Sequence, residues 1–304
     1  MMRLFLLIAC FGIGLSAASL SSATTHISSD PAAANIGREL VIYLDVQAST
    51  WRSRGRVSFG IVPSLRMKLI SAGFAVTQDP ESPHDLTLKV DYREEKGKQI
   101  TFSLSGTEIT CVMILDSPQL GRVVFPTIHV FPSYTGMVTA PYVEVVEKFQ
   151  TSPYFYYLGD LVRGQVDGYL DSTGALIKAV DRHFDRERHP PAVTPFDTLE
   201  SPAETFPDVD LLFSGSAQEN AVEELGRLKD ARAIGLLEQL MFHPERGTRL
   251  RAVLALGEFD APTVAPAMMR IVQTESDTDV RNAAAAALTR LSEKNATPGI
   301  VRSP

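Results

Sequence analysis

Length, composition and charge limit the classes of protein that this sequence can encode. The chain has 304 residues, of which 44% are hydrophobic and 21% charged, with a formal net charge of -7 at pH 7. These values exclude a wholly disordered chain, a collagen and a long coiled coil, and the length accommodates two domains. The acidic balance also argues against a nucleic-acid partner, because such proteins need a basic surface.

The first residues follow the pattern of a secretory signal. Arg3 gives a positive start, residues 4–15 are apolar, and small residues end at Ala23, so we expect residues 1–23 to be removed. The apolar stretch is shorter than the ~20 residues that a membrane-spanning helix needs. An alternative is a lipoprotein, because the residues before Cys10 resemble a bacterial lipobox. The signal predicts export, and together with the envelope-type features described below the expected location is the periplasm or outer envelope of a Gram-negative bacterium.

The number of cysteines rules out an intramolecular disulfide in the exported protein. Cys10 lies in the signal, which leaves Cys111 as the single cysteine of the mature chain. The apolar neighbours of Cys111 favour a small buried hydrophobic residue in a strand over a nucleophile.

The part of the chain before the proline-rich stretch predicts an α+β domain. Residues 24–36 are small and polar and read as a disordered leader, and residues 37–188 carry the domain. Alternating polar and apolar residues predict a mostly antiparallel sheet with one wet face, packed by helices. We expect a turn centred on Gly97, a bulge at Gly106 and a helix break at Gly174. The expected strands are 39–47, 74–77, 84–93, 99–116 and 121–131, and the expected helices are 58–72 and 154–184.

One pattern in this domain has parallels elsewhere. A helix that ends in Ser71-Ala72-Gly73-Phe74, followed by an acidic turn and a strand with Asp85-Leu86, is similar to small α+β domains of bacterial envelope lipoproteins. Lipoproteins of curli secretion and activators of peptidoglycan synthases have such domains. The resemblance implies a domain of the cell envelope.

The second half of the chain contains an internal repeat. Residues 189–215 are proline-rich and predict a linker, residues 216–294 predict an all-α repeat domain, and residues 295–304 a flexible tail. Ala221, Ala252 and Ala284 occupy equivalent positions at spacings of 31 and 32 residues. A second amphipathic helix follows each of the first two copies, and a helix pair per period of this length predicts a helical solenoid.

The repeat resembles HEAT repeats of the short phycobilisome-lyase type. That motif has an Arg three residues before an Ala, then Ala-Leu-Gly; Arg249 and Ala255-Leu256-Gly257 match it. Arg281 matches as well, with Thr289 in place of the Gly. The first copy departs from the motif, because Gln218 replaces the Arg and Glu224 replaces an Ala, as in a capping unit. The resemblance implies a surface that binds other proteins.

The sequence carries no motif for catalysis, for a cofactor or for a metal. The HExxH, CxxC, GxSxG and phosphate-binding loop patterns are all absent. Residues 181–189 hold several acidic and histidine side chains, for which a solvated helix end is favoured over a metal site. We therefore expect no enzyme, no cofactor and no metal.

Two groups of residues are candidates for contact with a ligand or a partner. A basic, aromatic loop follows the first predicted strand and either is a solvated loop or binds an anionic lipid headgroup or a glycan. Arginines at the starts of repeat helices are candidates for contact with a partner protein. The residues are Trp51, Arg52, Arg54 and Arg56 in the loop, and Arg249 and Arg281 in the repeats.

These observations predict an exported, non-enzymatic adaptor or scaffold of the bacterial envelope that binds a protein through a short HEAT-repeat domain. Alternatives are binding of an envelope lipid or glycan by the α+β domain, or a lyase-like accessory enzyme. The array has fewer repeats than the about three that a solenoid needs for stability. We therefore expect one end to dock on the first domain, on residues 211–213, on a second copy in a homo-oligomer, or on a partner.

Overall fold

The computed structural model describes residues 39–52, 59–99, 105–133, 141–168, 171–188 and 209–296. Residues 295 and 296, which the sequence assigns to the tail, are helical. The predicted signal and leader, residues 189–208 of the predicted linker and residues 297–304 of the predicted tail lie outside the described ranges. The predictions for them therefore stay predictions.

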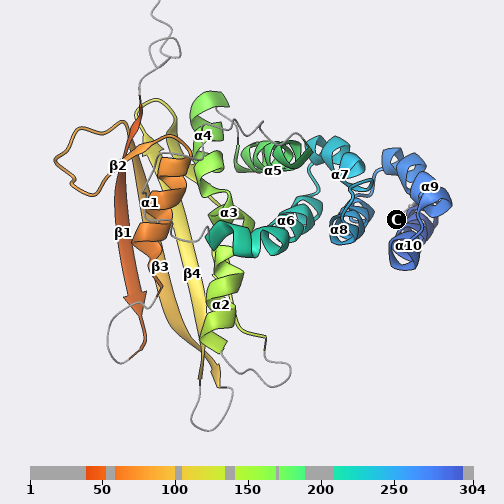
Figure 1. Cartoon of the computed structure of the whole chain (residues 1–304), viewed down its shortest axis with the longest axis horizontal. Coiled ribbons are helices and arrows are strands. Elements are labelled where there is room, and N and C mark those ends of the chain that lie inside the picture. Colours follow the sequence, from red (N-terminus) through yellow and green to blue (C-terminus); the bar gives the residue numbers. More distant parts are fainter. Residues whose placement is uncertain are drawn as a thin grey trace, which may run out of the picture. The chain divides into compact units, whose positions relative to one another are not determined.

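The first domain is built on a mixed sheet, as Figure 1 shows. β1 is parallel to β2 and to β3, because the helix between β1 and β2 returns the chain to the same end of the sheet. The pairs β3–β4, β4–β5 and β4–β6 are antiparallel. The predicted α+β class is thereby confirmed. The strands are β1 (Val41–Thr50), β2 (Ala75–Thr77), β3 (Leu86–Gln99), β4 (Ser105–Ser117), β5 (Gly121–Val124) and β6 (Ile128–Val130), and the order is β2-β1-β3-β4-β5.

The hairpin of β3 and β4 differs from the prediction at its far end. The turn expected around Gly97 is wrong, because β3 continues to Gln99. The register shifts between Lys96, opposite Thr107, and Gln99, opposite Ser105. The shift lies at Gly106, where the sequence predicts a bulge, so Gly97 belongs to a β-bulge rather than to a turn.

The strand expected over residues 121–131 is two short strands, β5 and β6. Phe125, between them, is buried, and Pro126 lacks the N–H that a continuous ladder would need.

Helices cover one face of the sheet (Figure 1). Leu86, Leu88 and Val90 of β3 are buried toward them, and alternate residues face the opposite side. The break expected at Gly174 comes earlier, because the Asp171 carboxylate accepts a hydrogen bond (2.7 Å) from the Gly174 N–H and starts a new helix there. The helices are α1 (Ile61–Ser71), α2 (Pro141–Gln150), α3 (Pro153–Tyr156), α4 (Leu158–Gly168) and α5 (Ser172–Arg188).

An aromatic cluster joins these helices to the sheet. The ring of Phe149 in α2 lies 4.4 Å from that of Phe155 in α3 and 5.3 Å from that of Tyr92 in β3, centroid to centroid. Phe59 contacts all three rings. Such tilted and edge-on pairs add to the burial of apolar area, so the cluster holds α2 and α3 on the sheet.

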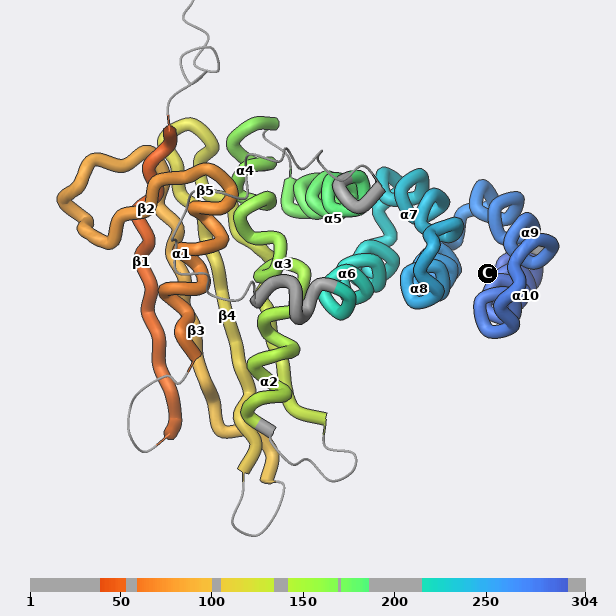
Figure 2. The backbone as a smooth tube through the Cα atoms, viewed as in Figure 1, coloured from red at the N-terminus to blue at the C-terminus, as the bar shows by residue number. Residues whose placement is uncertain are grey.

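The second half of the described chain is entirely helical, which confirms the predicted repeat domain (Figure 2). α6 begins at Val209, inside the stretch that composition assigns to the linker. α6 packs on α8 and α8 on α10, while α7 and α9 pack behind them. The elements are α6 (Val209–Leu228), η2 (Ala231–Ala233), α7 (Ile234–Leu240), α8 (Arg246–Gly257), η3 (Pro262–Val264), α9 (Ala265–Thr274) and α10 (Thr278–Ala296).

The close approach of α1 and α4 yields a first prediction. A Cβ on Gly159 would lie 2.3 Å from the Lys68 carbonyl oxygen and 2.8 Å from the Ala72 Cβ. Gly159→Ala should therefore lower the free energy of unfolding by about 1–3 kcal/mol, as overpacking does, measured by urea denaturation.

The matched control is Gly235→Ala in α7, where an added Cβ meets no atom within 4 Å. This change should leave stability unchanged or raise it by about 0.5–1 kcal/mol, because Ala is the better helix former. A Gly159→Ala variant as stable as the control variant would contradict the packing of α1 on α4.

Candidate functional site

The contact between successive repeats explains the small residues of the motif. A Cβ on Gly226 would lie 2.6 Å from the Ala255 Cα, and a Cβ on Gly257 would lie 3.2 Å from the Ala287 Cβ. The Gly of one copy thus receives an Ala of the next copy, which lets the helices approach closely. Thr289 holds this position in the third copy and is exposed.

The two candidate arginines of the repeats lie at turns between helices. Nη1 of Arg249 donates to the carbonyls of His243 (3.0 Å) and Pro244 (2.8 Å). Nη1 of Arg281 donates to the carbonyls at the same offsets, Glu275 (2.9 Å) and Ser276 (3.5 Å). Each arginine therefore binds the turn that precedes its helix.

A carboxylate reinforces the first of these arginines. Glu275 forms an ion pair with Arg249 (2.9 Å), and both side chains are largely buried. Hydrogen bonds from the Asp277 N–H and from Arg249 hold the pKa of Glu275 below its ordinary value, although burial opposes them. The arrangement stabilises the repeat from within.

The first repeat docks on the α+β domain through the residues that depart from the motif. Gln218, in place of the Arg, is hydrogen-bonded to the ring of His183 in α5. Glu224, in place of the Ala, accepts a hydrogen bond (3.1 Å) from the Tyr154 hydroxyl of α3. Both departures have the same cause, because the neighbour of this copy is the α+β domain and not another repeat. Of the neighbours considered for the end of the array, the structure selects the first domain.

Further contacts widen this junction. Asn220 donates to the Thr151 carbonyl (3.3 Å), and Nη2 of Arg232 donates to both carboxylate oxygens of Asp171 at 3.0 Å. The Gly174 N–H and the Arg232 guanidinium hold the pKa of Asp171 below its ordinary value. The Asp171 carboxylate thus caps α5 and binds the repeat domain at once.

An exposed cluster of interface-type residues lies on the outer surface of the repeats. Phe242 follows α7 and is 46% exposed, and Met269 in α9 is 48% exposed. The Arg270 guanidinium carbon lies 4.7 Å from the centre of the Phe242 ring. Aromatic residues, Met and Arg are the types enriched at the centres of protein interfaces. The sequence signal for Phe242 is that it falls outside the apolar stripe marked by Leu237 and Leu240 of α7.

The basic, aromatic loop after β1 is described only at its start. Trp51 is 40% exposed, and its indole N–H donates to the Thr107 hydroxyl at 3.4 Å. The guanidinium of Arg52 lies 4.4 Å from the centre of the Tyr142 ring. Arg54 and Arg56 lie outside the described residues. Trp51 and Arg52 are thus near each other in chain and space, but each contacts a different element.

Glu94 is a buried carboxylate beside this loop that sequence reasoning missed. It lies in β3 and is 2% exposed; one oxygen, Oε1, accepts hydrogen bonds from the hydroxyls of Tyr142 (2.6 Å) and Tyr92 (3.3 Å). Burial and the nearby carboxylate raise the pKa of Tyr92. Among the described residues, Oε2 has no hydrogen-bond partner. The alternation of β3, continued from Val90 and Tyr92, is the signal that places Glu94 inside.

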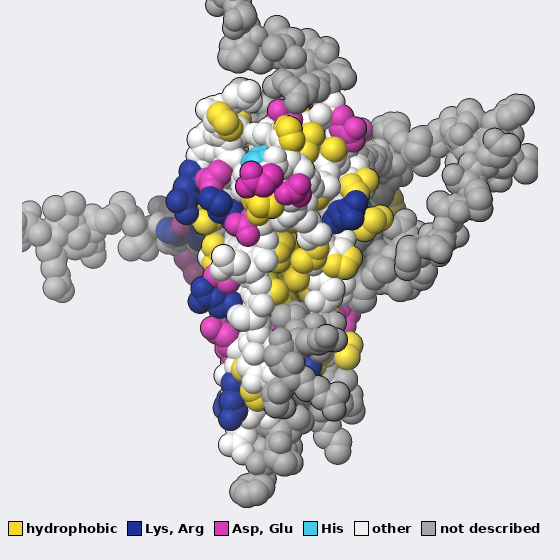
Figure 3. Space-filling view, turned by 90° about the vertical axis from the view of Figure 1, so that its left-hand side faces the viewer, with side chains coloured by type: hydrophobic (Ala, Val, Ile, Leu, Met, Phe, Trp, Pro, Cys, Tyr) yellow, Lys and Arg dark blue, Asp and Glu magenta, His cyan; other side chains and the backbone are white. Residues whose placement is uncertain are grey.

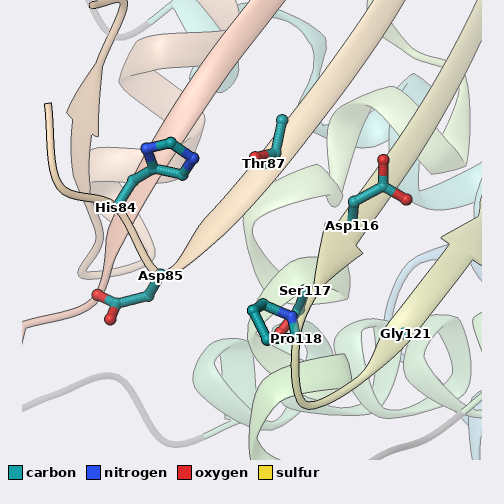
Figure 4. Close-up of a pocket in the computed structure, with 7 residues that line it drawn as sticks. All are labelled: His84, Asp85, Thr87, Asp116, Ser117, Pro118 and Gly121. Carbon is teal, nitrogen blue, oxygen red and sulfur yellow. The ribbon is translucent and has the colours of Figure 1, made fainter. Parts of the chain in front are cut away.

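A shallow groove of about 280 Å³ lies where the turn before β3 meets the β4–β5 hairpin (Figure 4). Its acids are engaged within the chain: Asp85 accepts from the Val41 N–H (2.9 Å), and Asp116 pairs with Lys89 (2.8 Å). In Figure 4 the side chains of His84, Asp85 and Asp116 point in different directions. The groove therefore lacks a convergent set of polar groups.

The remaining chemical candidates are accounted for. Cys111 is buried in β4, as predicted, and burial raises the pKa of its thiol to about 12. Within the described ranges, no three His, Cys, Asp or Glu residues are placed to hold a metal ion. No helix in that part of the chain has the length and apolarity to cross a membrane.

Comparison with known proteins assigns the repeats. Residues 211–289 match the family model of HEAT repeats, which confirms that the C-terminal helices are HEAT-like. A search of curated proteins finds no match to the chain.

The docking of the first repeat yields a second prediction. Glu224→Ala restores the repeat motif but leaves the buried Tyr154 hydroxyl without its acceptor. The variant should lose about 1–2 kcal/mol of unfolding free energy, and Tyr154→Phe in the same background should cost less than it does alone. Urea denaturation of the single and double variants measures this coupling.

The control is Glu223→Ala, because Glu223 is exposed and pairs with Arg251 on the repeat surface. An exposed pair contributes between about 0 and 1 kcal/mol. Additive effects of Glu224→Ala and Tyr154→Phe would contradict the junction.

Proposed function

We propose that the protein is an exported adaptor of the bacterial envelope that binds a partner protein through the surface of its HEAT-like repeats. HEAT repeats are commonly protein-interaction modules, which is the general basis of the proposal. The observation that carries it is the exposed cluster of Phe242 and Arg270 on the described repeats; Met269, beside Arg270 in the chain, is exposed as well.

Several other charged groups of the repeat surface are engaged within the chain. Arg249 and Arg281 bind backbone carbonyls, and Arg251 bridges Glu219 (3.6 Å) across two helices. In contrast, Arg270 lies over an exposed ring, where desolvation by a partner would strengthen its attraction to the ring. Arg249 and Arg281, which the sequence suggests as partner contacts, thus hold the turns of the repeats in shape. Phe242 and Arg270 are better placed to touch a partner.

Export and a non-enzymatic role complete the proposal. Export rests on the signal-like residues 1–23. A non-enzymatic role is supported by the buried, protonated thiol of Cys111 and by acids that are engaged within the chain. The resemblance to lyase-type repeats concerns helix packing, and we draw no lyase activity from it.

Export is tested by the mass and N-terminal sequence of the protein from its own cells. The expected mature chain begins at Thr24 and lies in the envelope fraction. A chain that begins at an acylated Cys10 would select the lipoprotein alternative. A chain that keeps residues 1–23 in the cytosol would contradict export.

The partner surface is tested by crosslinking and affinity purification of the full-length protein from the envelope fraction. Phe242→Ala and Arg270→Ala should each reduce recovery of the same protein at least about fivefold, because residues at an interface centre typically contribute 1–2 kcal/mol or more. The control is Leu254→Ala on α8, which is equally exposed and lies outside the cluster.

If recovery of every partner is unchanged in both variants, the repeat surface is not the binding site. The alternative of an envelope lipid or glycan bound near Trp51 would then replace the proposal.

A further inference from the structure

The edge of the sheet is open along most of β1. β2 pairs with Val41–Tyr43 alone, whereas β3 pairs with β1 from Ile42 to Thr50. Among the described residues, positions 44–50 of β1 therefore have a neighbouring strand on one side only.

Backbone hydrogen bonds at the start of β1 show which backbone groups point outward. The Leu40 carbonyl accepts from the Ala75 N–H (3.0 Å) on the β2 side, and the Val41 carbonyl accepts from the Asp85 N–H (2.9 Å) on the β3 side. Because the direction alternates along a strand, even-numbered residues present N–H and C=O to the β2 side. The open groups are those of Leu44, Val46, Ala48 and Thr50.

Residues 44–50 carry little of the usual protection of an edge strand against pairing, because Asp45 is their one charged residue. Residues 44–50 contain no Pro and no Lys, and their register with β3 is unbroken. Proteins normally blunt such an edge with these residues or with a bulge. An exposed row of backbone groups is satisfied by another extended backbone, as in β-strand addition.

The side chains beside this edge indicate which side chains an added strand would need. Lys68 and Ala72 of α1 face α4, so Val62 and Arg66 lie on the opposite flank of α1, toward the edge. Arg66 is exposed and has no ion pair with a described residue. Figure 3, which views the side where β1 and β2 lie, shows hydrophobic side chains through its middle with charged ones around them. An added strand would meet apolar groups and one free cation on its helix side.

A second copy of the chain fits this edge poorly. Antiparallel pairing of β1 with itself would place the β2 strand of the second copy in line with the residues that follow Thr50. Trp51 already lies there: its backbone N–H donates to the Glu94 carbonyl (3.0 Å), so the chain continues alongside β3 after Thr50. Trp51 would therefore collide with the β2 strand of the second copy. A separate extended segment has no such obstacle.

We propose that the β1 edge binds an extended segment of a partner protein, which adds as a strand in line with β2. The segment spans the length of residues 44–50. It carries apolar residues and one acidic residue, facing Arg66, on its helix side, and polar residues on the other. The proposal is independent of the repeat surface and adds a second interaction site.

The probe is a phage-displayed library of random dodecapeptides selected on the full-length protein. Binding of the selected peptides is measured by fluorescence anisotropy. Ala48→Pro removes an edge-facing N–H at an exposed position that β3 does not use, so the sheet is retained. We expect at least about tenfold weaker binding, since the hydrogen bond is lost and the ring blocks the incoming strand. The control is Gln47→Ala, whose backbone faces β3, and it should bind within about twofold of wild type.

A second variant tests the charge without touching the sheet. Arg66→Glu on α1 should weaken the same peptides at least about threefold and favour peptides that carry Lys instead. Phe242→Ala should leave peptide binding unchanged, which separates this site from the proposed partner surface of the repeats.

Amide exchange gives an independent readout. In the free protein the N–H groups of Val46 and Ala48 should exchange fast and those of Asp45 and Gln47 slowly, and bound peptide should slow the first pair. Edge amides that are already protected in the free protein would overturn the proposal, as would peptides insensitive to Ala48→Pro, or a selection that yields no binders.

Discussion

The repeat domain depends on the junction between its first copy and the α+β domain. A short HEAT array exposes an apolar helix face at each end, and too few copies bury too little area for independent stability. Here α3 and α5 cover the first face, with Tyr154 bound to Glu224 and His183 to Gln218. At the other end of the described repeats, Thr289 and two alanines of α10 are exposed. The α+β domain thus takes the place of a capping repeat.

Within the repeats, some charged residues stabilise the helix pairs and others remain exposed. Arg249 and Arg281 repeat because the turn they bind repeats, and their bonds to carbonyls at fixed offsets hold each helix pair in shape. Charged groups that serve the geometry in this way are not free for partners. In the proposed function, contact with a partner falls to residues that do not follow the period, of which Phe242 and Arg270 are the clearest pair.

The sheet likewise combines strands that are paired on both sides with one strand, β1, whose edge is open. Its helix side is filled by apolar residues and an aromatic cluster around Phe149, and its central strand β3 has β1 on one side and β4 on the other. β1 is the exception, because β2 is too short to cover it. An adaptor with one interaction surface on its helices and one on a strand edge would join two partners by different physics, side-chain anchors in one case and main-chain hydrogen bonds in the other.

The sequence by itself determined the elements that rest on local periodicity. The aligned Ala221, Ala252 and Ala284 predicted the helical repeat, and alternation predicted the α+β sheet and the buried Cys111. What the tertiary structure decided depends on contacts between distant residues. The parallel pairing of β1, the continuation of β3 past Gly97 and the contact of Glu94 with Tyr142 follow from the packing of distant segments, which local composition does not encode. The partners of Gln218 and Glu224 also became visible only when the fold brought α3 and α5 beside the first repeat.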